Sequence, residues 1–151
     1  MTDTPDSVIL QASAVAIEGR ALLIEGEPGM GKSSLALALI DRGAQLIGDD
    51  GVTVARAADD TQSRLIASAP PNIKGLLEVR GVGLVRFAVS PPVPVALILS
   101  LSDAETERLP ETIGCRDILS CAIPTLPFHP GSLAPAERAK AALRLHGLAL
   151  G

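Results

Sequence analysis

One eight-residue segment, residues 26–33, limits the possible folds of this chain more than any other feature. It reads Gly-Glu-Pro-Gly-Met-Gly-Lys-Ser and fits the phosphate-binding P-loop pattern G-x-x-x-x-G-K-[ST] at every fixed position. The apolar residues 21–25 before it predict a buried strand, and residues 32–42 after it are rich in helix formers. In a strand, loop and helix of this kind, backbone N–H groups and the positive end of the helix dipole surround one anion. We therefore expect nucleotide phosphates to bind at Gly26, Glu27, Pro28, Gly29, Met30, Gly31, Lys32, Ser33 and Ser34.

Two side chains of this segment have defined chemistry in P-loop proteins. The Lys32 ammonium is expected to reach the β- and γ-phosphates, and the Ser33 hydroxyl is expected to ligate Mg²⁺. ATP and Mg²⁺ are therefore the expected cofactors. The alternative is a glycine-rich turn with an exposed lysine, which a preceding strand and a following helix disfavour.

The other apolar segments indicate a sheet around this unit. Residues 14–17 read as a strand that turns back into residues 21–25, and residues 52–56 form a hairpin pattern with residues 64–67. Residues 95–101 are continuously apolar, apart from one serine, as in a strand that is buried on both faces. The pattern predicts a mixed, mostly buried β-sheet with flanking helices, which is an α/β fold.

The C-terminal third is proline-rich and ends in a helical pattern. Prolines at positions 124, 127 and 130 predict an extended tail, and residues 135–146 predict a final helix with proline in its first turn. A length of 151 residues suits one domain. We expect a disordered N-terminus over residues 1–7 and a single P-loop domain over residues 8–151.

Charge and aromatic content argue against nucleic acid as a partner. Thirteen Lys and Arg against seventeen Asp and Glu give a net charge of −4, with no basic block to neutralise a phosphate backbone. Phe87 and Phe128 are the only aromatic residues, so the chain has no platform for stacking bases.

Neither a membrane nor an oxidising compartment is expected. The apolar run over residues 93–101 is far shorter than the roughly 20 residues that cross a bilayer. The first seven residues have no basic residue and no apolar stretch of the secretory kind. Cys115 and Cys121 are the only cysteines, and we interpret them as free thiols of a cytoplasmic protein.

Two groups of charged residues are candidates to complete the site. Asp49 and Asp50 follow a short strand, seventeen residues after Lys32, where α/β proteins place their ligands. Flanking glycines would let one carboxylate face a metal and the other an attacking hydroxyl, although an Asp-Asp pair beside glycine is also a common solvated turn. Glu78 and Arg80 share one face of an extended segment and could hold metal and phosphate, or simply pair with each other.

These segments together resemble the catalytic domain of HPr kinase/phosphorylase, the bacterial enzyme that acts on a serine of the phosphocarrier protein HPr. The resemblance rests on residues 26–33, the Asp49-Asp50 pair and Glu78-Val79-Arg80-Gly81-Val82-Gly83, and it runs clearly from about residue 8 to residue 101. P-loops are shared by many families, whereas a Glu-x-Arg-Gly-x-Gly segment after an acid pair is far more specific.

The resemblance implies an ATP-dependent serine kinase that also removes the phosphoryl group with phosphate, releasing pyrophosphate. It implies that Asp49 is the general base for the serine hydroxyl and the general acid in reverse, that Asp50 and Glu78 lie near the metal with Ser33, and that Arg80 and Lys32 contact phosphate. It also implies a homo-oligomer, which is a hexamer in the family, in which a neighbouring subunit helps to bind HPr.

This sequence departs from the family pattern in three places. We expect a short form without the N-terminal domain of the long members. Gln11 stands where the family has a histidine, and an amide cannot relay a proton. The C-terminal part is shorter, and Arg138, Lys140 and Arg144 are only faint counterparts of a basic stretch that contacts HPr. Two alternatives stay open: a P-loop kinase of a small metabolite, and a non-catalytic ATP-binding sensor, which Gln11 favours.

Overall fold

The computed structural model describes residues 6–57, 64–71, 75–104, 113–131 and 133–149. Within these ranges the chain forms two helices, α1 (Lys32–Asp41) and α2 (Pro135–His146), and eleven strands. The strands are β1 (Ser7–Leu10), β2 (Ser13–Ile17), β3 (Arg20–Glu25), β4 (Gln45–Gly48), β5 (Val52–Arg56), β6 (Leu65–Ser68), β7 (Leu76–Val79), β8 (Gly83–Arg86), β9 (Val93–Leu101), β10 (Gly114–Ile118) and β11 (Cys121–Phe128).

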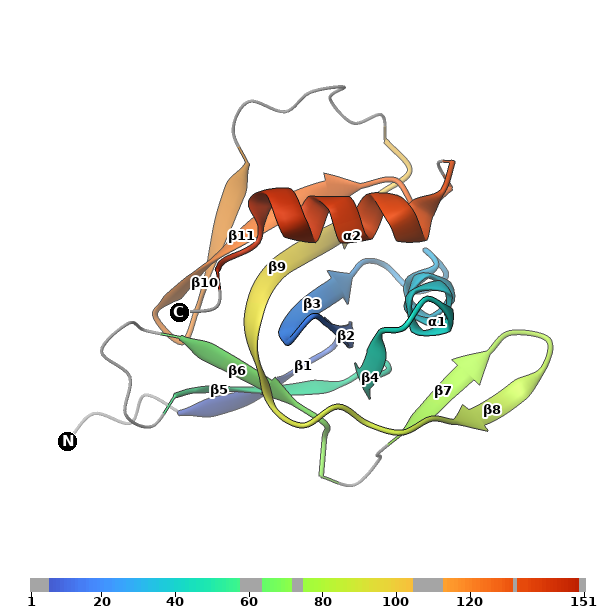
Figure 1. The fold of residues 1–151 in the computed structure, drawn as a ribbon, viewed down its shortest axis with the longest axis horizontal. Helices are drawn as coiled ribbons and strands as arrows, with labels where there is room; N and C mark the ends of the chain where they lie inside the picture. Colours follow the sequence, from blue (N-terminus) through green and yellow to red (C-terminus); the bar gives the residue numbers. More distant parts are fainter. Residues whose placement is uncertain (1–5, 58–63, 72–74, 105–112, 132, 150–151) are drawn as a thin grey trace.

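Strand β9 joins the parts of the main sheet. The strand order is β1-β5-β6-β9-β3-β2-β4, and β11 with its partner β10 also pairs with β9. The first residues of β9 pair antiparallel with β6, whereas its later residues run parallel to both β3 and β11. Figure 1 shows that β9 curves strongly along its length. The hairpin β7–β8 forms a separate two-stranded sheet that projects beside α1.

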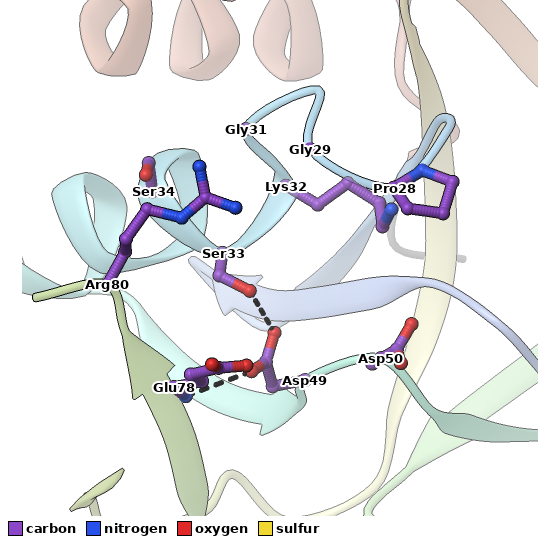
Figure 2. A pocket seen from close by; sticks show the side chains of 10 residues that line it. All are labelled: Pro28, Gly29, Gly31, Lys32, Ser33, Ser34, Asp49, Asp50, Glu78 and Arg80. Atoms are coloured by element: carbon purple, nitrogen blue, oxygen red, sulfur yellow. Dashed lines mark hydrogen bonds between the residues drawn. The ribbon is translucent and has the colours of Figure 1, made fainter. Parts of the chain in front are cut away.

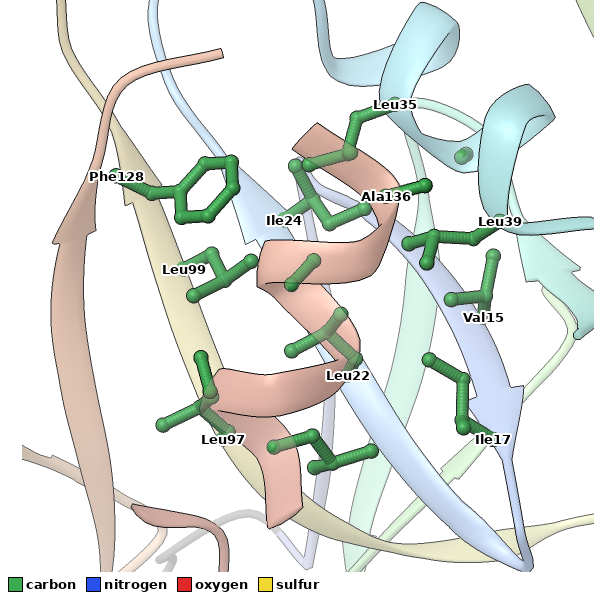
Figure 3. Packing of buried hydrophobic residues seen from close by; sticks show 14 of the residues in the cluster. Val15, Ile17, Leu22, Ile24, Leu35, Leu39, Leu97, Leu99, Phe128 and Ala136 are labelled. Carbon is green, nitrogen blue, oxygen red and sulfur yellow. The ribbon is translucent and has the colours of Figure 1, made fainter. Parts of the chain in front are cut away.

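The curved sheet buries apolar side chains on both of its faces. Alternation along β3 sends Leu22 and Ile24 toward α1 and α2, and Leu23 toward the opposite face. Strand β9 alternates in the same way, with Leu97 and Leu99 on the helix side (Figure 3). Strands β3 and β9 are therefore held rigidly, and their carboxyl ends form a firm base for the loop that follows β3.

Much of the sequence-based prediction is confirmed. The chain has the expected α/β fold with a mixed sheet and flanking helices, and the strand–loop–helix unit and the final helix lie where the pattern placed them. The hairpin of β5 and β6 is also confirmed. No helix in the described ranges is long and apolar enough to cross a membrane.

Of two expectations about the chain, the one for the proline-rich segment is wrong, and the one for residues 1–7 is tested only at residues 6 and 7. The proline-rich segment is not an extended tail, because Pro124 and Pro127 lie inside β11. This strand pairs with β10 up to Thr125 and with β9 from Thr125 onward. Among the described residues, each half therefore has one unpaired edge, on which a residue without an N–H group is tolerated. At the N-terminus, residues 1–5 lie outside the described ranges, but Ser7 already pairs with Ala55 in β5.

Candidate active site

The loop between β3 and α1 has the backbone shape that its glycines permit. Gly29 and Gly31 have φ values of 84° and 105°, in the left-handed region that side chains disfavour. Gly31 is the N-cap of α1, and no side chain caps this helix end. The Leu35 N–H donates to the Gly31 carbonyl at 3.0 Å, so the N–H groups before Leu35 have no acceptor within the helix. These free amides are the donors that an anion requires.

The Lys32 side chain folds back onto the first residues of the loop. Its Nζ donates to the carbonyl oxygen of Gly26 at 2.8 Å and lies 3.4 Å from that of Glu27. Both bonds are to neutral carbonyl groups, so the ammonium charge is available to a phosphate that enters the loop. Lys32 is half-buried, which strengthens any such interaction compared with one in open water.

The Asp49 carboxylate connects three segments of the site. Its Oδ1 accepts hydrogen bonds from the hydroxyls of Ser33, at 2.6 Å, and Ser13, at 3.0 Å. Its Oδ2 accepts the backbone N–H of Glu78 at 3.1 Å. Figure 2 shows Asp49 between the start of α1 and the end of β7, as these bonds require. The first acid of the pair is therefore tied directly to the loop serine.

The second acid has a different setting. Asp50 has a φ of 58°, a conformation that aspartate tolerates better than most residues, and its side chain is exposed. The bend before it is tight, because a Cβ on Gly48 would lie 2.0 Å from the carbonyl oxygen of Gly51. The bend sends the two acids in different directions, as their flanking glycines suggested (Figure 2).

A cavity of about 350 Å³ lies between the loop, the acid pair and the hairpin β7–β8. Two cationic and three anionic side chains line the cavity, which gives these side chains a net formal charge of −1. A bound polyphosphate would therefore need further neutralisation by backbone amides and a cation. The hairpin contributes Arg80, whose guanidinium extends toward the start of α1 (Figure 2). The residues that line the cavity are Pro28, Gly29, Gly31, Lys32, Ser33, Ser34, Asp49, Asp50, Glu78 and Arg80.

The donor set fits a magnesium ion that is bound together with substrate phosphates. Because the Ser33 hydroxyl gives its proton to Asp49, its lone pairs are available to a cation. In the described ranges, no three His, Cys, Asp or Glu residues form a ready metal site. Mg²⁺ usually takes one or two protein ligands and completes its shell with phosphate and water, so such a cluster is not required.

All ten residues that line the cavity are among those predicted from sequence. The remaining predicted residues, Gly26, Glu27 and Met30, do not line it, although the first two receive the Lys32 hydrogen bonds. Gln11 is exposed and also does not line it. The expected division of roles, with Asp49 as base and Asp50 at the metal, stays a prediction, although it is Asp49 that touches Ser33.

The sequence did not reveal the part played by Ser13. This residue is fully buried (0% exposed) and lies 36 positions before the carboxylate that it contacts. The residues that follow it in β2 are all apolar, so the segment reads as plain core strand. Only the pairing of β2 between β3 and β4 brings Ser13 to the site.

An ion pair lies directly before the loop, at the end of β3. Arg116 on β10 donates to the Glu25 carboxylate at the end of β3, and this hydrogen bond raises the pKa of Arg116 above its usual value. A second ion pair lies on α2, where Arg144 donates to Glu18. Arg144, a faint counterpart of the basic stretch that contacts HPr in the family, therefore already has a partner within this chain.

The fold and the site define a class. A buried parallel strand that leads into a glycine-rich loop and a helix, with an acid pair at the same sheet edge, is an arrangement that α/β proteins use to bind anionic ligands. The family model "HPr Serine kinase C-terminal domain" matches residues 5–132, and the chain belongs to this family.

Similar proteins carry related names. HPr kinase/phosphorylase of Geobacillus thermodenitrificans is 35% identical over 130 residues, which are 78% of this chain and 41% of that protein. The protein of the same name from Cupriavidus necator is 38% identical over 123 residues, 75% of this chain and 36% of that protein. The chain thus spans about two fifths of the length of these relatives. The solved structure of the Hpr(Ser) kinase/phosphatase from Coxiella burnetii has a TM-score of 0.78 and 29% identity, and the match covers 92% of this chain and 95% of that one.

Proposed function

We propose that this protein is an ATP-dependent serine kinase that phosphorylates the phosphocarrier HPr and also catalyses the phosphate-dependent removal of that phosphoryl group. The observation that carries the proposal is the position of Asp49, which joins the loop serine Ser33 to the Glu-x-Arg hairpin in one cavity. Membership of the family and the names of its relatives support HPr as the acceptor.

Binding of ATP is proposed to use the free amides of the loop. The N–H groups at the start of α1 and the Lys32 ammonium would hold the phosphates, and Arg80 would contact the transferred group from the hairpin side. Ser33, Asp50 and Glu78 are the proposed ligands or near neighbours of Mg²⁺, which supplies charge neutralisation on the phosphate oxygens. Positioning and charge stabilisation are the main sources of rate in phosphoryl transfer.

The forward step is the attack of a serine hydroxyl oxygen on the γ-phosphorus of ATP. A new P–O bond forms to serine, the bond between the γ-phosphorus and the bridging oxygen breaks, and ADP leaves with the electron pair. The hydroxyl proton passes to the Asp49 carboxylate, whose Oδ2 receives only one hydrogen bond in the described structure.

The reverse direction uses inorganic phosphate as the nucleophile. A phosphate oxygen attacks the phosphorus of phosphoserine, the serine Oγ leaves with the electron pair, and pyrophosphate forms. The attacking phosphate supplies the proton that Asp49 gives to the serine oxygen, so that Asp49 ends the step in the protonation state in which it began. Because Gln11 stands where the family has a histidine and cannot carry a proton, we expect this direction to be slower than the kinase direction.

Three further features belong to the proposal. The acceptor HPr would approach the open side of the cavity between the loop and the hairpin β7–β8. The active form would be a homo-oligomer, hexameric as in the family that the sequence resembles. The reaction would take place in the cytoplasm, which suits two cysteines that form no disulfide in the described ranges.

Labelled ATP and a panel of acceptors test this function. The protein would be incubated with Mg²⁺ and γ-labelled ATP, with HPr, with a set of small hydroxyl metabolites, and without acceptor, and the Lys32→Ala variant would serve as the control. We expect label on HPr and none with Lys32→Ala. Label on a metabolite alone would support a small-molecule kinase, and ATP binding without transfer or hydrolysis would support a sensor module.

A further inference from the structure

Ser13 is a buried polar residue placed between the two functional strand ends. It opens β2, which pairs on one side with β3, the strand that leads into the phosphate loop, and on the other with β4, the strand that leads to Asp49. Its register partner in β3 is Ile24, close to the start of the loop. Full burial prevents it from meeting an acceptor or a nucleotide.

A buried hydroxyl costs free energy unless it is hydrogen-bonded, and the described partner of Ser13 is the carboxylate. Its Oγ donates to Asp49 Oδ1 at 3.0 Å, the same oxygen that accepts from Ser33 at 2.6 Å. In the described ranges, Ser90 is the only other polar residue that is buried as a whole, and it donates to the carbonyl of its own neighbour Pro91. The Ser13 bond therefore connects the core to the site, whereas the Ser90 bond stays local.

The three donors to Asp49 differ in how firmly they are held. Ser33 belongs to the loop that we propose binds phosphate and metal, and the Glu78 N–H belongs to the separate β7–β8 sheet at the cavity wall. Ser13 alone lies in the main sheet with a strand on either side. Its position is therefore set by the main sheet and not by the loop or the hairpin.

We propose that Ser13 is a positioning residue, whose buried hydroxyl fixes the Asp49 carboxylate between the loop serine and the acceptor. The expected effect of Ser13 on kcat rests on the proposed function. The Ser13 hydrogen bond also has a consequence that needs no transfer: because Asp49 orients the Ser33 hydroxyl, loss of Ser13 weakens the gain in nucleotide affinity that Mg²⁺ brings.

The test compares Ser13→Ala and Ser13→Thr with Ser90→Ala, a matched loss of another buried hydroxyl. For each protein, kcat and KM for ATP are measured with HPr, and the affinity for ADP is measured by calorimetry with and without Mg²⁺. We expect Ser13→Ala to lower kcat about tenfold, as for the loss of a hydrogen bond to a charged group, and to leave KM nearly unchanged. We also expect Ser13→Ala to reduce the gain in ADP affinity that Mg²⁺ brings. Ser13→Thr should restore both kcat and this gain, and Ser90→Ala should change neither.

The Asp49→Asn background decides whether Ser13 acts through the carboxylate. If it does, adding Ser13→Ala to Asp49→Asn causes no further loss of the Mg²⁺-dependent affinity gain. An equal additional loss overturns the inference, as does a Ser13→Ala protein that behaves like Ser90→Ala. If Ser13→Thr does not fold, the comparison in the Asp49→Asn background alone decides between these outcomes.

The two proposals fail in different ways. If Ser13→Ala lowers the Mg²⁺-dependent gain in ADP affinity, but the wild type transfers phosphate to no acceptor, the proposed function is overturned and the role of Ser13 is supported. A wild-type protein that phosphorylates HPr, with a Ser13→Ala variant that is equally active and equally responsive to Mg²⁺, overturns the role of Ser13 alone. Absence of ADP binding by the wild type overturns both.

Discussion

Among single residues, the two neighbouring aspartates have unequal surroundings. Asp49 is half-buried and accepts three hydrogen bonds from β2, α1 and β7, whereas Asp50 is exposed at the cavity wall. A carboxylate held by three donors has a fixed position, which a general base requires. An exposed carboxylate suits a water-filled metal shell instead.

The substitutions Asp49→Asn and Asp50→Asn separate these roles. We expect Asp49→Asn to bind ATP almost as well as the wild type without Mg²⁺, to lose part of the affinity gain that Mg²⁺ brings, and to lose about 10²- to 10⁴-fold in kcat, since the amide cannot take the serine proton. Asp50→Asn should chiefly raise the Mg²⁺ concentration needed for half-maximal rate. Steady-state kinetics over a range of Mg²⁺ concentrations measure both effects, and a larger loss of kcat in Asp50→Asn than in Asp49→Asn would reverse the assignment.

At this scale, sequence reasoning succeeded where a residue's chemistry depends on near neighbours. Gly29, Gly31 and Lys32 belong to a contiguous motif whose backbone requirement is local. The bond from Ser13 to Asp49 spans 36 positions and depends on the order of strands in the sheet, so no local pattern encodes it.

Among the elements, the bend after β4 matters most for the site. Gly48 has no room for a side chain, because the carbonyl oxygen of Gly51 would lie 2.0 Å from its Cβ. A Cβ on Gly51 would meet no atom within 4 Å. The two glycines flank the same acid pair, so they form a natural pair of test and control.

We expect Gly48→Ala to open the bend and move Asp49 away from Ser33. Overpacking of this kind costs about 1–3 kcal/mol of stability, and transfer should fall at least tenfold. Gly51→Ala should match the wild type in both respects. Thermal unfolding and the transfer assay check the pair, and the explanation fails if the two variants lose equally.

Strands were predicted well where they are buried on both faces, and poorly where one strand pairs with a different neighbour along each half. Strands β3 and β9 have continuous apolar runs because neighbours cover both faces, and such runs are visible in sequence. Strand β11 contains two prolines and reads as irregular, and only its divided pairing between β10 and β9 makes it a strand. The separate hairpin β7–β8 was visible only as a run of apolar and charged residues between glycines, because its place beside α1 depends on tertiary packing.

For the molecule as a whole, α2 closes the helix-covered face of the sheet. Its buried side is made of small residues, Ala136, Ala139 and Ala142, together with Leu143, which allow close approach to the sheet and α1. At its exposed edges, Glu137 pairs with Arg42, the C-cap residue of α1, and Arg144 pairs with Glu18. Both salt bridges are exposed and contribute little to stability, so α2 is held on the sheet mainly by apolar burial.

The pairing of Glu18 predicts a small pH dependence of stability. The hydrogen bond from Arg144, with its charge, lowers the pKa of Glu18 below its ordinary value of 4.5. Stability from this pair is therefore fully present above pH 4.5 and is lost as the pH falls through the lower, folded-state pKa. Glu18→Gln should lower Tm slightly at pH 7, and the difference from the wild type should vanish at acidic pH. A Tm difference that grows on acidification would contradict this explanation.

The most direct test of the proposed reaction is mass spectrometry of HPr after incubation with this protein, Mg²⁺ and ATP, followed by addition of excess inorganic phosphate. We predict one added phosphoryl group on a serine of HPr, which is absent when Lys32→Ala replaces the wild type, and its slower removal with release of pyrophosphate once phosphate is added. HPr that stays unmodified, while the same protein binds ATP in the presence of Mg²⁺, would contradict the function proposed for the cavity around Ser33 and Asp49.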